Sequence, residues 1–337
     1  MTTGRHDAAT PPTGRLAIGV DIGGTKVAAG VVDENGIILD RERRATPSHD
    51  VSETEATIVE VVNELMLRHD VVAVGIGAAG WIANDRATVL FSPHLAWRDE
   101  PLRDALAGRI DAPLLVENDG NTTAWAEHRF GAARGTAISV CITLGTGIGG
   151  GLIIDGRVFR GAYGVGCEYG HMTVVPDGRR CACGNRGCWE MYASGTALAR
   201  DARELAEVSP VSAHALMRLA KGDLRRLTGP LVTEAARQGD ASAVEIYTEM
   251  GRWLGRGIAS LAAALDPAVF VIGGGVSEAG EELLLEPARQ MFAVSLTGRG
   301  FRPVARIAMA ELGPDAGWVG AADLARGTLA PVSDNAL

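Results

Sequence analysis

The sequence contains very little lysine and no long hydrophobic run. Only Lys26 and Lys221 are lysines among the 337 residues, and no basic run exceeds two residues, as in Arg43-Arg44. Acidic residues outnumber basic ones by 41 to 32, which gives a net charge of −9. Nucleic-acid binding needs a basic footprint that this composition does not supply. No apolar run approaches the roughly 20 residues that a membrane span requires. We therefore expect neither nucleic acid nor membrane as a partner.

The sequence also shows no features of a signal peptide or of a disulfide framework. Residues 1–15 have no apolar core of the kind that a signal peptide needs, and they predict a flexible leader. Cysteines number five, and three of them lie between residues 181 and 188. An odd, clustered set of this kind favours a metal in a reducing compartment over disulfides. These features predict a cytoplasmic protein.

One unit of sequence occurs twice. An apolar strand over residues 16–21 leads through a glycine-rich loop into a second apolar run and an Asp/Asn-Gly turn, and residues 138–156 repeat this order. The chain is also longer than one hydrophobic core usually accommodates. The repeat predicts two α/β domains facing each other across a cleft. We place the first domain at residues 16–132 plus a returning segment at about 318–337, and the second at residues 133–317.

Three glycine-rich loops are candidates for binding phosphate. Glycine lets backbone N–H groups approach an anion closely. The first loop is not a P-loop, because the GxxxxGK[ST] spacing is missing, and the second lacks the strand-then-helix context of a dinucleotide site. The third loop follows a buried strand and precedes an expected helix. Each loop alone could be an ordinary hairpin turn, but three of them distributed over both domains favour a nucleotide site. The candidate residues are Asp21 (a possible water-mediated Mg²⁺ ligand), Gly23, Gly24, Thr25, Lys26, Gly145, Thr146, Gly147, Gly273, Gly274 and Gly275.

Asp119 is the candidate general base. It follows an apolar strand and precedes a helix expected from Asn121 to Arg129, and ligand chemistry in α/β sheets usually lies at such strand ends. An aspartate at this point can accept the proton of an attacking hydroxyl while Asn118 binds the substrate. The alternative is that Asp119 or Asn121 only caps the helix.

A second cluster has the spacing of a metal site. His171, Cys181, Cys183 and Cys188 offer one imidazole and three thiolates, the ligands of a closed, tetrahedral, structural zinc site. The alternative is a set of reduced, unliganded thiols. Cys141 lies in an apolar strand and is expected in the core.

The order of these motifs resembles the ROK family of repressors, open reading frames and kinases, and in particular its bacterial glucokinases. The resemblance covers about residues 16–326. It rests on Asp21-x-Gly-Gly-Thr-Lys, Glu117-Asn-Asp, Leu144-Gly-Thr-Gly, Glu168-x-Gly-His, Cys181-x-Cys-Gly-x-x-Gly-Cys-x-Glu and Gly273-Gly-Gly.

The resemblance implies a two-domain actin/hexokinase-like (ribonuclease H-like) α/β fold with the active site in the cleft between the domains. It implies ATP-dependent phosphorylation of glucose to glucose 6-phosphate, with Mg²⁺, a structural Zn²⁺ and Asp119 as the base for the sugar 6-hydroxyl. The sugar would be bound by residues from four segments, namely Gly80, Asn118, Asp119, Glu168, His171 and Glu190. The glycine loops named above would flank the ATP phosphates and the adenosine.

Other readings of the same residues stay open. Glucose is favoured over another hexose or an N-acetylhexosamine, such as N-acetylmannosamine or fructose, by the resemblance alone, because epimers differ only in the orientation of one hydroxyl. A non-catalytic sugar sensor could use the same pocket. A ROK repressor is disfavoured, because only about 15 residues precede the first strand. The resemblance also implies a homodimer or homotetramer.

Overall fold

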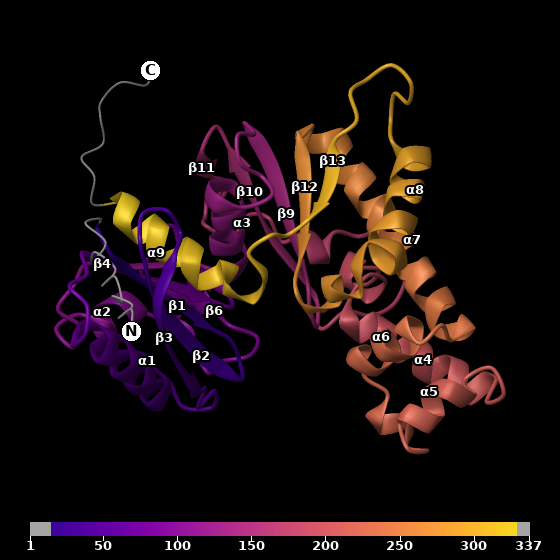
Figure 1. The fold of residues 1–337 in the computed structure, drawn as a ribbon, viewed down its shortest axis with the longest axis horizontal. Helices are drawn as coiled ribbons and strands as arrows, with labels where there is room; N and C mark the ends of the chain where they lie inside the picture. The colour runs from indigo at the N-terminus through magenta and orange to yellow at the C-terminus, as the bar shows by residue number, and fades with distance from the viewer. Residues whose placement is uncertain (1–14, 329–337) are drawn as a thin grey trace, which may run out of the picture.

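Two five-stranded sheets form the framework of the computed structural model, which describes residues 15–328 (Figure 1). The first sheet has the order β3-β2-β1-β4-β8 and the second has the order β11-β10-β9-β12-β13. The first sheet consists of β1 (Ala17–Ile22), β2 (Lys26–Val32), β3 (Ile38–Ala45), β4 (Ala73–Ala78) and β8 (Leu114–Asn118). The second consists of β9 (Ile138–Leu144), β10 (Ile148–Ile154), β11 (Arg157–Val158), β12 (Val269–Gly273) and β13 (Arg306–Met309).

The two sheets share one topology. In each, a strand pairs antiparallel with the hairpin strand that follows it and parallel with a strand much further along the chain. The last strand of each sheet is also parallel to its neighbour. This confirms the repeat expected from the sequence. A three-stranded sheet that the sequence did not predict is added to the first half, with strands β5 (Trp81–Ile82), β6 (Val89–Phe91) and β7 (Arg98–Glu100).

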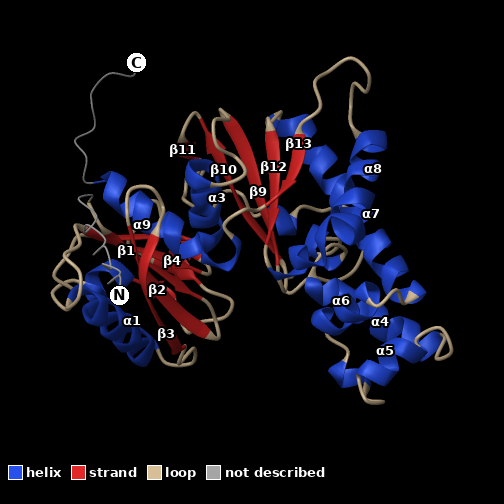
Figure 2. Ribbon diagram, in the orientation of Figure 1, coloured by secondary structure: helices blue, strands red, loops and turns tan. Residues whose placement is uncertain are grey.

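Helices cover both sheets, as Figure 2 shows. Those of the first half are α1 (Val51–Met66), α2 (Leu102–Leu106) and α3 (Asp119–Phe130). Those that follow the second hairpin are α4 (Gly195–Val208), α5 (His214–Leu219), α6 (Gly229–Arg237), α7 (Ala241–Leu265), α8 (Glu286–Ser295) and α9 (Ala316–Thr328). Within the described part of the chain, no helix has both the length and the apolar character that crossing a membrane requires.

The final helix, α9, packs against the first sheet. Trp318 of α9 packs against Gly19 and Gly30, where a side chain at either glycine would overlap it. Helix α3 lies between the halves: it packs against α9 and also touches β10, where Gly120 meets the backbone of Gly150. The two helices pack in smaller hydrophobic clusters, apart from the large core of each sheet.

Two helix boundaries differ from the expectation. Helix α3 begins at Asp119, two residues early, because the side chain of Asn118 accepts a hydrogen bond from the Asn121 N–H at 3.0 Å and caps the helix. Asp119 and Asn121 are therefore not the caps. The helix expected after the third glycine loop is divided into a 3₁₀ turn (Gly275–Ala279), a π turn (Glu281–Leu285) and α8. Gly280, with φ of 89°, ends the first of these turns.

Candidate active site

Asp119 lies half-buried in the first turn of α3, where strand β8 ends. Its Oδ1 accepts hydrogen bonds from the Gly120 N–H at 3.0 Å and from Asn118 Nδ2 at 3.1 Å. Burial, followed by the charge of Glu168, raises the pKa of Asp119 to about 6, although the Gly120 hydrogen bond acts in the opposite direction. A carboxylate with a pKa near neutrality is suited to accept a proton at physiological pH.

Asp21 brings a second carboxylate to the same place. It is the fifth residue of β1, and burial raises its pKa to about 7, with the charge of Asp119 adding to the rise and Lys26 opposing it. The turn that follows is tight: the Gly23 N–H donates to the Lys26 carbonyl at 3.1 Å. The two aspartates, from β1 and α3, therefore act electrostatically on each other beside a lysine.

The second half contributes Glu168 and His171. Glu168 Oε2 lies 3.9 Å from His171 Nε2, and the 3₁₀ turn Tyr169–His171 places both residues. Burial raises the pKa of Glu168, while His171 and the Trp81 indole, which is within hydrogen-bonding reach, lower it. Since Glu168 in turn raises the pKa of Asp119, the two carboxylates lie across the boundary between the halves and act on each other.

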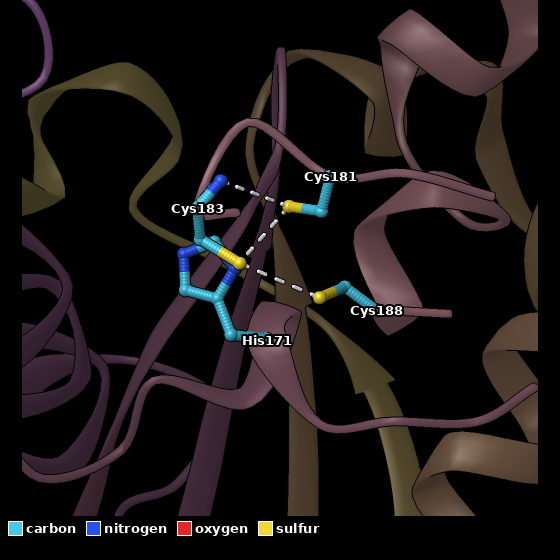
Figure 3. A group of neighbouring side chains, drawn as sticks. All are labelled: His171, Cys181, Cys183 and Cys188. Atoms are coloured by element: carbon cyan, nitrogen blue, oxygen red, sulfur yellow. Dashed lines mark hydrogen bonds between the residues drawn. The ribbon is translucent and has the colours of Figure 1, made fainter. Parts of the chain in front are cut away.

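The four expected zinc ligands come together. The ligand atoms of His171, Cys181, Cys183 and Cys188 all lie within 4.8 Å of one another, and Figure 3 shows the side chains converging. Cys183 Sγ is 3.6 Å from Cys188 Sγ, and Cys181 Sγ is 3.7 Å from His171 Nδ1. Ligands in a tetrahedral zinc site are about 3.6–3.8 Å apart, given zinc–sulfur and zinc–nitrogen bonds of about 2.3 and 2.0 Å. The cluster therefore fits zinc, with Nδ1 of His171 toward the thiols and Nε2 toward Glu168.

Glu190 connects this cluster to the second glycine loop. Its Oε1 lies 3.0 Å from Cys181 Sγ and 3.7 Å from His171 Nδ1. Its Oε2 lies so close to Gly147 that a Cβ at that position would be only 2.3 Å away. A residue with any side chain at position 147 would displace this carboxylate.

The two remaining cysteines, Cys141 and Cys167, lie outside the cluster. Cys141, in β9, is 2% exposed and belongs to a hydrophobic cluster with Val269 and Val271 of β12, as predicted for a core residue. Cys167 Sγ contacts the Phe159 carbonyl at 3.6 Å.

A pocket of about 570 Å³ opens next to the second and third glycine loops. Gly145, Thr146 and Gly275 of the expected ATP residues line it. Among the described residues, its lining does not include Gly23–Lys26, Gly147, Gly273 or Gly274. Strand register nevertheless places Gly273 beside Thr143, directly before the second loop.

Sequence reasoning missed the opposite wall of this pocket. It is formed by the beginning and middle of α4 and by α6 from its beginning to its end, with the residues Gly195, Thr196, Ala199, Arg203, Thr228, Gly229, Pro230, Thr233 and Arg237. Thr196 Oγ1 donates to the Thr146 carbonyl at 2.7 Å and ties α4 to the second glycine loop. No local signal distinguishes these residues from an ordinary amphipathic helix surface, since only tertiary packing brings them to the loop.

Sequence reasoning also gave no role to Glu117, the first residue of its Glu-Asn-Asp motif, or to Arg160. Glu117 is fully buried and lies 3.0 Å from the nearly buried Arg160. The Glu-Asn-Asp motif includes Glu117, but Arg160, with which Glu117 pairs, is 43 residues away in the sequence.

The comparison with known proteins defines the class. The ROK family model matches residues 17–328, so the chain belongs to the ROK family. The expected actin/hexokinase-like, two-domain fold is confirmed by the similarity of the chain to solved ROK glucokinase structures.

Particular relatives are also similar over nearly the whole chain. A glucokinase of Streptomyces coelicolor is 48% identical over 311 residues, covering 92% of this chain and 98% of the relative. The crystal structure of a ROK family glucokinase from Streptomyces griseus in complex with glucose and AMPPNP is 51% identical, with a TM-score of 0.84 and coverage of 93% and 99%. An N-acetylmannosamine kinase of Yersinia pseudotuberculosis is 33% identical over 260 residues, covering 77% of this chain and 82% of the relative.

Proposed function

We propose that this protein transfers the γ-phosphoryl group of ATP to the 6-hydroxyl of glucose, with Asp119 as the general base. The observation that carries the proposal is the position of Asp119, whose pKa of about 6 is set by burial and by Glu168 across the cleft. The similarity to glucokinases, one of them solved with glucose and AMPPNP, supports the choice of substrates.

The sugar site is proposed at the meeting point of the two halves. Asn118 Nδ2 donates to the Gly80 carbonyl at 3.0 Å, so these two residues form one wall. Glu168, His171 and Glu190 form the other wall, and their carboxylates and imidazole can bind sugar hydroxyls. Asp119 accepts the 6-hydroxyl proton as the phosphoryl group is transferred.

ATP is proposed to occupy the pocket lined by Gly145, Thr146 and Gly275, with backbone N–H groups of the glycine loops facing the phosphates. Gly23, Gly24, Thr25, Lys26, Gly147, Gly273 and Gly274 are proposed to complete the phosphate and adenosine contacts. Asp21 would hold Mg²⁺, directly or through water, since Mg²⁺ prefers oxygen ligands and keeps part of its hydration shell. Mg²⁺ bound there supplies positive charge to the phosphate oxygens.

Zn²⁺ is proposed as a structural ion held by His171, Cys181, Cys183 and Cys188. All four positions are taken by protein ligands, which leaves none open for substrate. The ion would fix the loop that carries Glu190 and, through Nδ1, the orientation of the His171 ring.

Three broader expectations accompany this proposal. Residues 16–132 plus about 318–337 would form one domain and residues 133–317 the other; residues 329–337 and nearly all of the expected leader lie outside the described residues. We further expect a cytoplasmic homodimer or homotetramer, which light scattering of the purified protein would test.

The decisive experiment is an ADP-release assay with Mg-ATP over a panel of hexoses and N-acetylhexosamines, with polyphosphate as an alternative donor. The proposal predicts turnover led by glucose, and loss of that turnover in a folded Asp119→Asn protein. Turnover led by N-acetylmannosamine would favour the second candidate, for which the Yersinia relative is the supporting observation. No turnover from folded, zinc-loaded protein would favour a sugar sensor.

A further inference from the structure

Glu117 is a buried charge directly before Asn118 and Asp119. Its side chain is fully buried, and Oε2 lies 3.0 Å from Arg160 Nε and 3.2 Å from Arg86 Nε. Burying a carboxylate is costly unless it is paired and hydrogen-bonded. The proposed mechanism requires no such charge, which raises the question of what the ion pair does.

Glu117 holds the residues that follow it in place. Its Oε1 accepts hydrogen bonds from the Asn118 N–H at 2.9 Å and from Asn121 Nδ2 at 3.1 Å. Both donors belong to the beginning of α3, on either side of Asp119. The position of Glu117 therefore sets where the first turn of α3, and with it the proposed base, is located.

Arg160 extends this arrangement to a second segment. Its Nη2 donates to the carbonyls of Ile82 at 3.2 Å and Ala83 at 3.0 Å, and its Nη1 lies 3.3–3.4 Å from the carbonyl and side-chain oxygens of Asn84. These three residues follow Gly80, whose carbonyl accepts from Asn118. The segment of residues 80–84 is thus held at two points, by Asn118 at Gly80 and by the Arg160 guanidinium at residues 82–84.

The segment that carries Arg160 leads to the opposite wall. Asn84 Nδ2 donates back to the Ala162 carbonyl at 3.2 Å, and Gly164 approaches the Ile82 carbonyl so closely that a Cβ would lie 2.4 Å from it. Glu168 and His171 follow a few residues later. Three segments that bear proposed sugar ligands therefore meet at a single guanidinium, which is 7% exposed.

We propose that Arg160 is a positioning residue for the sugar site, which it serves by locking Glu117, residues 82–84 and the loop toward Glu168 into one geometry. The inference rests on the proposed function. Arg160 is not among the described residues that line the ATP pocket or form the metal cluster, so its effect is specific to the sugar. Arginine suits the task because its planar fork presents five donors, whereas lysine offers a single point charge with three.

The test compares Arg160→Lys with a matched variant, Arg326→Lys. Arg326 is also 7% exposed and pairs with Asp323 at 2.8 Å, but it lies in α9 and bonds to the Val32 carbonyl at the far end of the first sheet. In Arg160→Lys the glucose KM rises, or kcat falls, by about tenfold to a hundredfold, as misplaced ligands produce. The ATP KM and the zinc content stay as in the wild type. Arg326→Lys lowers the Tm about as much as Arg160→Lys does, but its glucose KM stays within about twofold of the wild-type value. A change of that size is smaller than the one that losing a typical hydrogen bond to the substrate would cause.

A milder variant keeps the test decisive if Arg160→Lys does not fold. Asn84→Ala removes the side-chain contacts to Arg160 and to Ala162, and it raises the glucose KM about two- to tenfold, the range expected for single hydrogen bonds. An unchanged kcat/KM for glucose in both folded variants overturns the inference, as does a parallel rise in the KM of both substrates. The turnover of glucose by the wild-type protein is measured first. If the wild type phosphorylates glucose, a negative result with the variants counts against the role of Arg160 and not against the proposed function.

Discussion

The two halves of the molecule have the same strand order but differ in charge at equivalent positions. At the ends of β1, β4 and β8, strand register places three residues side by side, namely Asp21, Gly77 and Glu117. The equivalent positions in the second sheet are Thr143, Gly273 and Ala310. Ala310 lies one residue beyond the end of β13, and its N–H still donates to the Ile272 carbonyl of β12. Both acids of the first set are thus replaced by uncharged residues in the second.

The difference agrees with the two tasks proposed for one framework. The first half places carboxylates where the proposed mechanism needs a proton acceptor, and burial raises the pKa of both Asp21 and Asp119. The second half leaves its strand ends uncharged and forms a 570 Å³ pocket beside Gly145 and Gly275, suited to an anionic nucleotide. Its own acids, Glu168 and Glu190, come from the inserted metal-binding loop and not from the repeated sheet.

The largest expected effect is on the charged half. Asp119→Ala lowers kcat by about 10²-fold to 10⁴-fold, because no group remains to accept the hydroxyl proton. Stopped assays of ADP formation at saturating substrates measure the loss. Asp104→Ala, which removes an exposed carboxylate of α2, serves as the control and keeps full turnover. Near-normal kcat in a folded Asp119→Ala protein would refute the assignment of the base.

The next effect concerns the metal loop, which supplies the acids that the second sheet lacks. Cys188→Ser lowers zinc affinity and activity by more than the about ten- to hundredfold typical of losing a residue that only supports a ligand, since it removes a buried ligand and frees the loop that holds Glu190. Elemental analysis and glucose titrations on the same samples measure both. Cys167→Ser is the control, because its thiol lies outside the cluster. Full glucose affinity in zinc-free protein would contradict the account.

A third prediction concerns how the ionised carboxylate of Asp119, in the charged half, lowers the stability of the fold. The pKa of Asp119 is raised in the fold, so the folded state binds this proton more tightly than the unfolded state, and stability falls as pH rises from about 4 to about 6. Asp119→Asn removes a cost of about 1–3 kcal/mol above pH 6. The variant therefore has a higher Tm than the wild type at pH 7.5 and an equal one near pH 4. A Tm gain that is independent of pH would show that charge is not the cause.

The smallest effect is expected in the uncharged half. Thr196→Val removes the hydroxyl that donates to the Thr146 carbonyl and raises the ATP KM about two- to tenfold, without changing the glucose KM. Thr248→Val, which loses a comparable 2.8 Å hydrogen bond within α7, leaves both constants unchanged. An equal rise in both constants would mean that the two substrate sites are not separated as proposed.

Local patterns predicted the features that are continuous in sequence. The repeated hairpins, the metal ligands within residues 171–188 and the strand end at Asp119 could be read from spacing and residue type. The cap at Asn118 was missed because three neighbouring residues, Asn118, Asp119 and Asn121, were all suitable caps. The Glu117–Arg160 pair and the pocket wall of α4 and α6 join segments far apart in the chain, and no local period encodes such contacts.

The pH dependence of kcat/KM for glucose tests the central claim most directly, because kcat/KM reports the pKa values of the free enzyme. Asp119 and Asp21 have pKa values of about 6 and about 7, and they interact, so the account predicts an acid limb between pH 6 and 7. Below it kcat/KM falls about tenfold per pH unit or more steeply, since a protonated Asp119 cannot accept the hydroxyl proton. A kcat/KM that stays constant down to pH 5, in protein that remains folded and zinc-loaded, would contradict it.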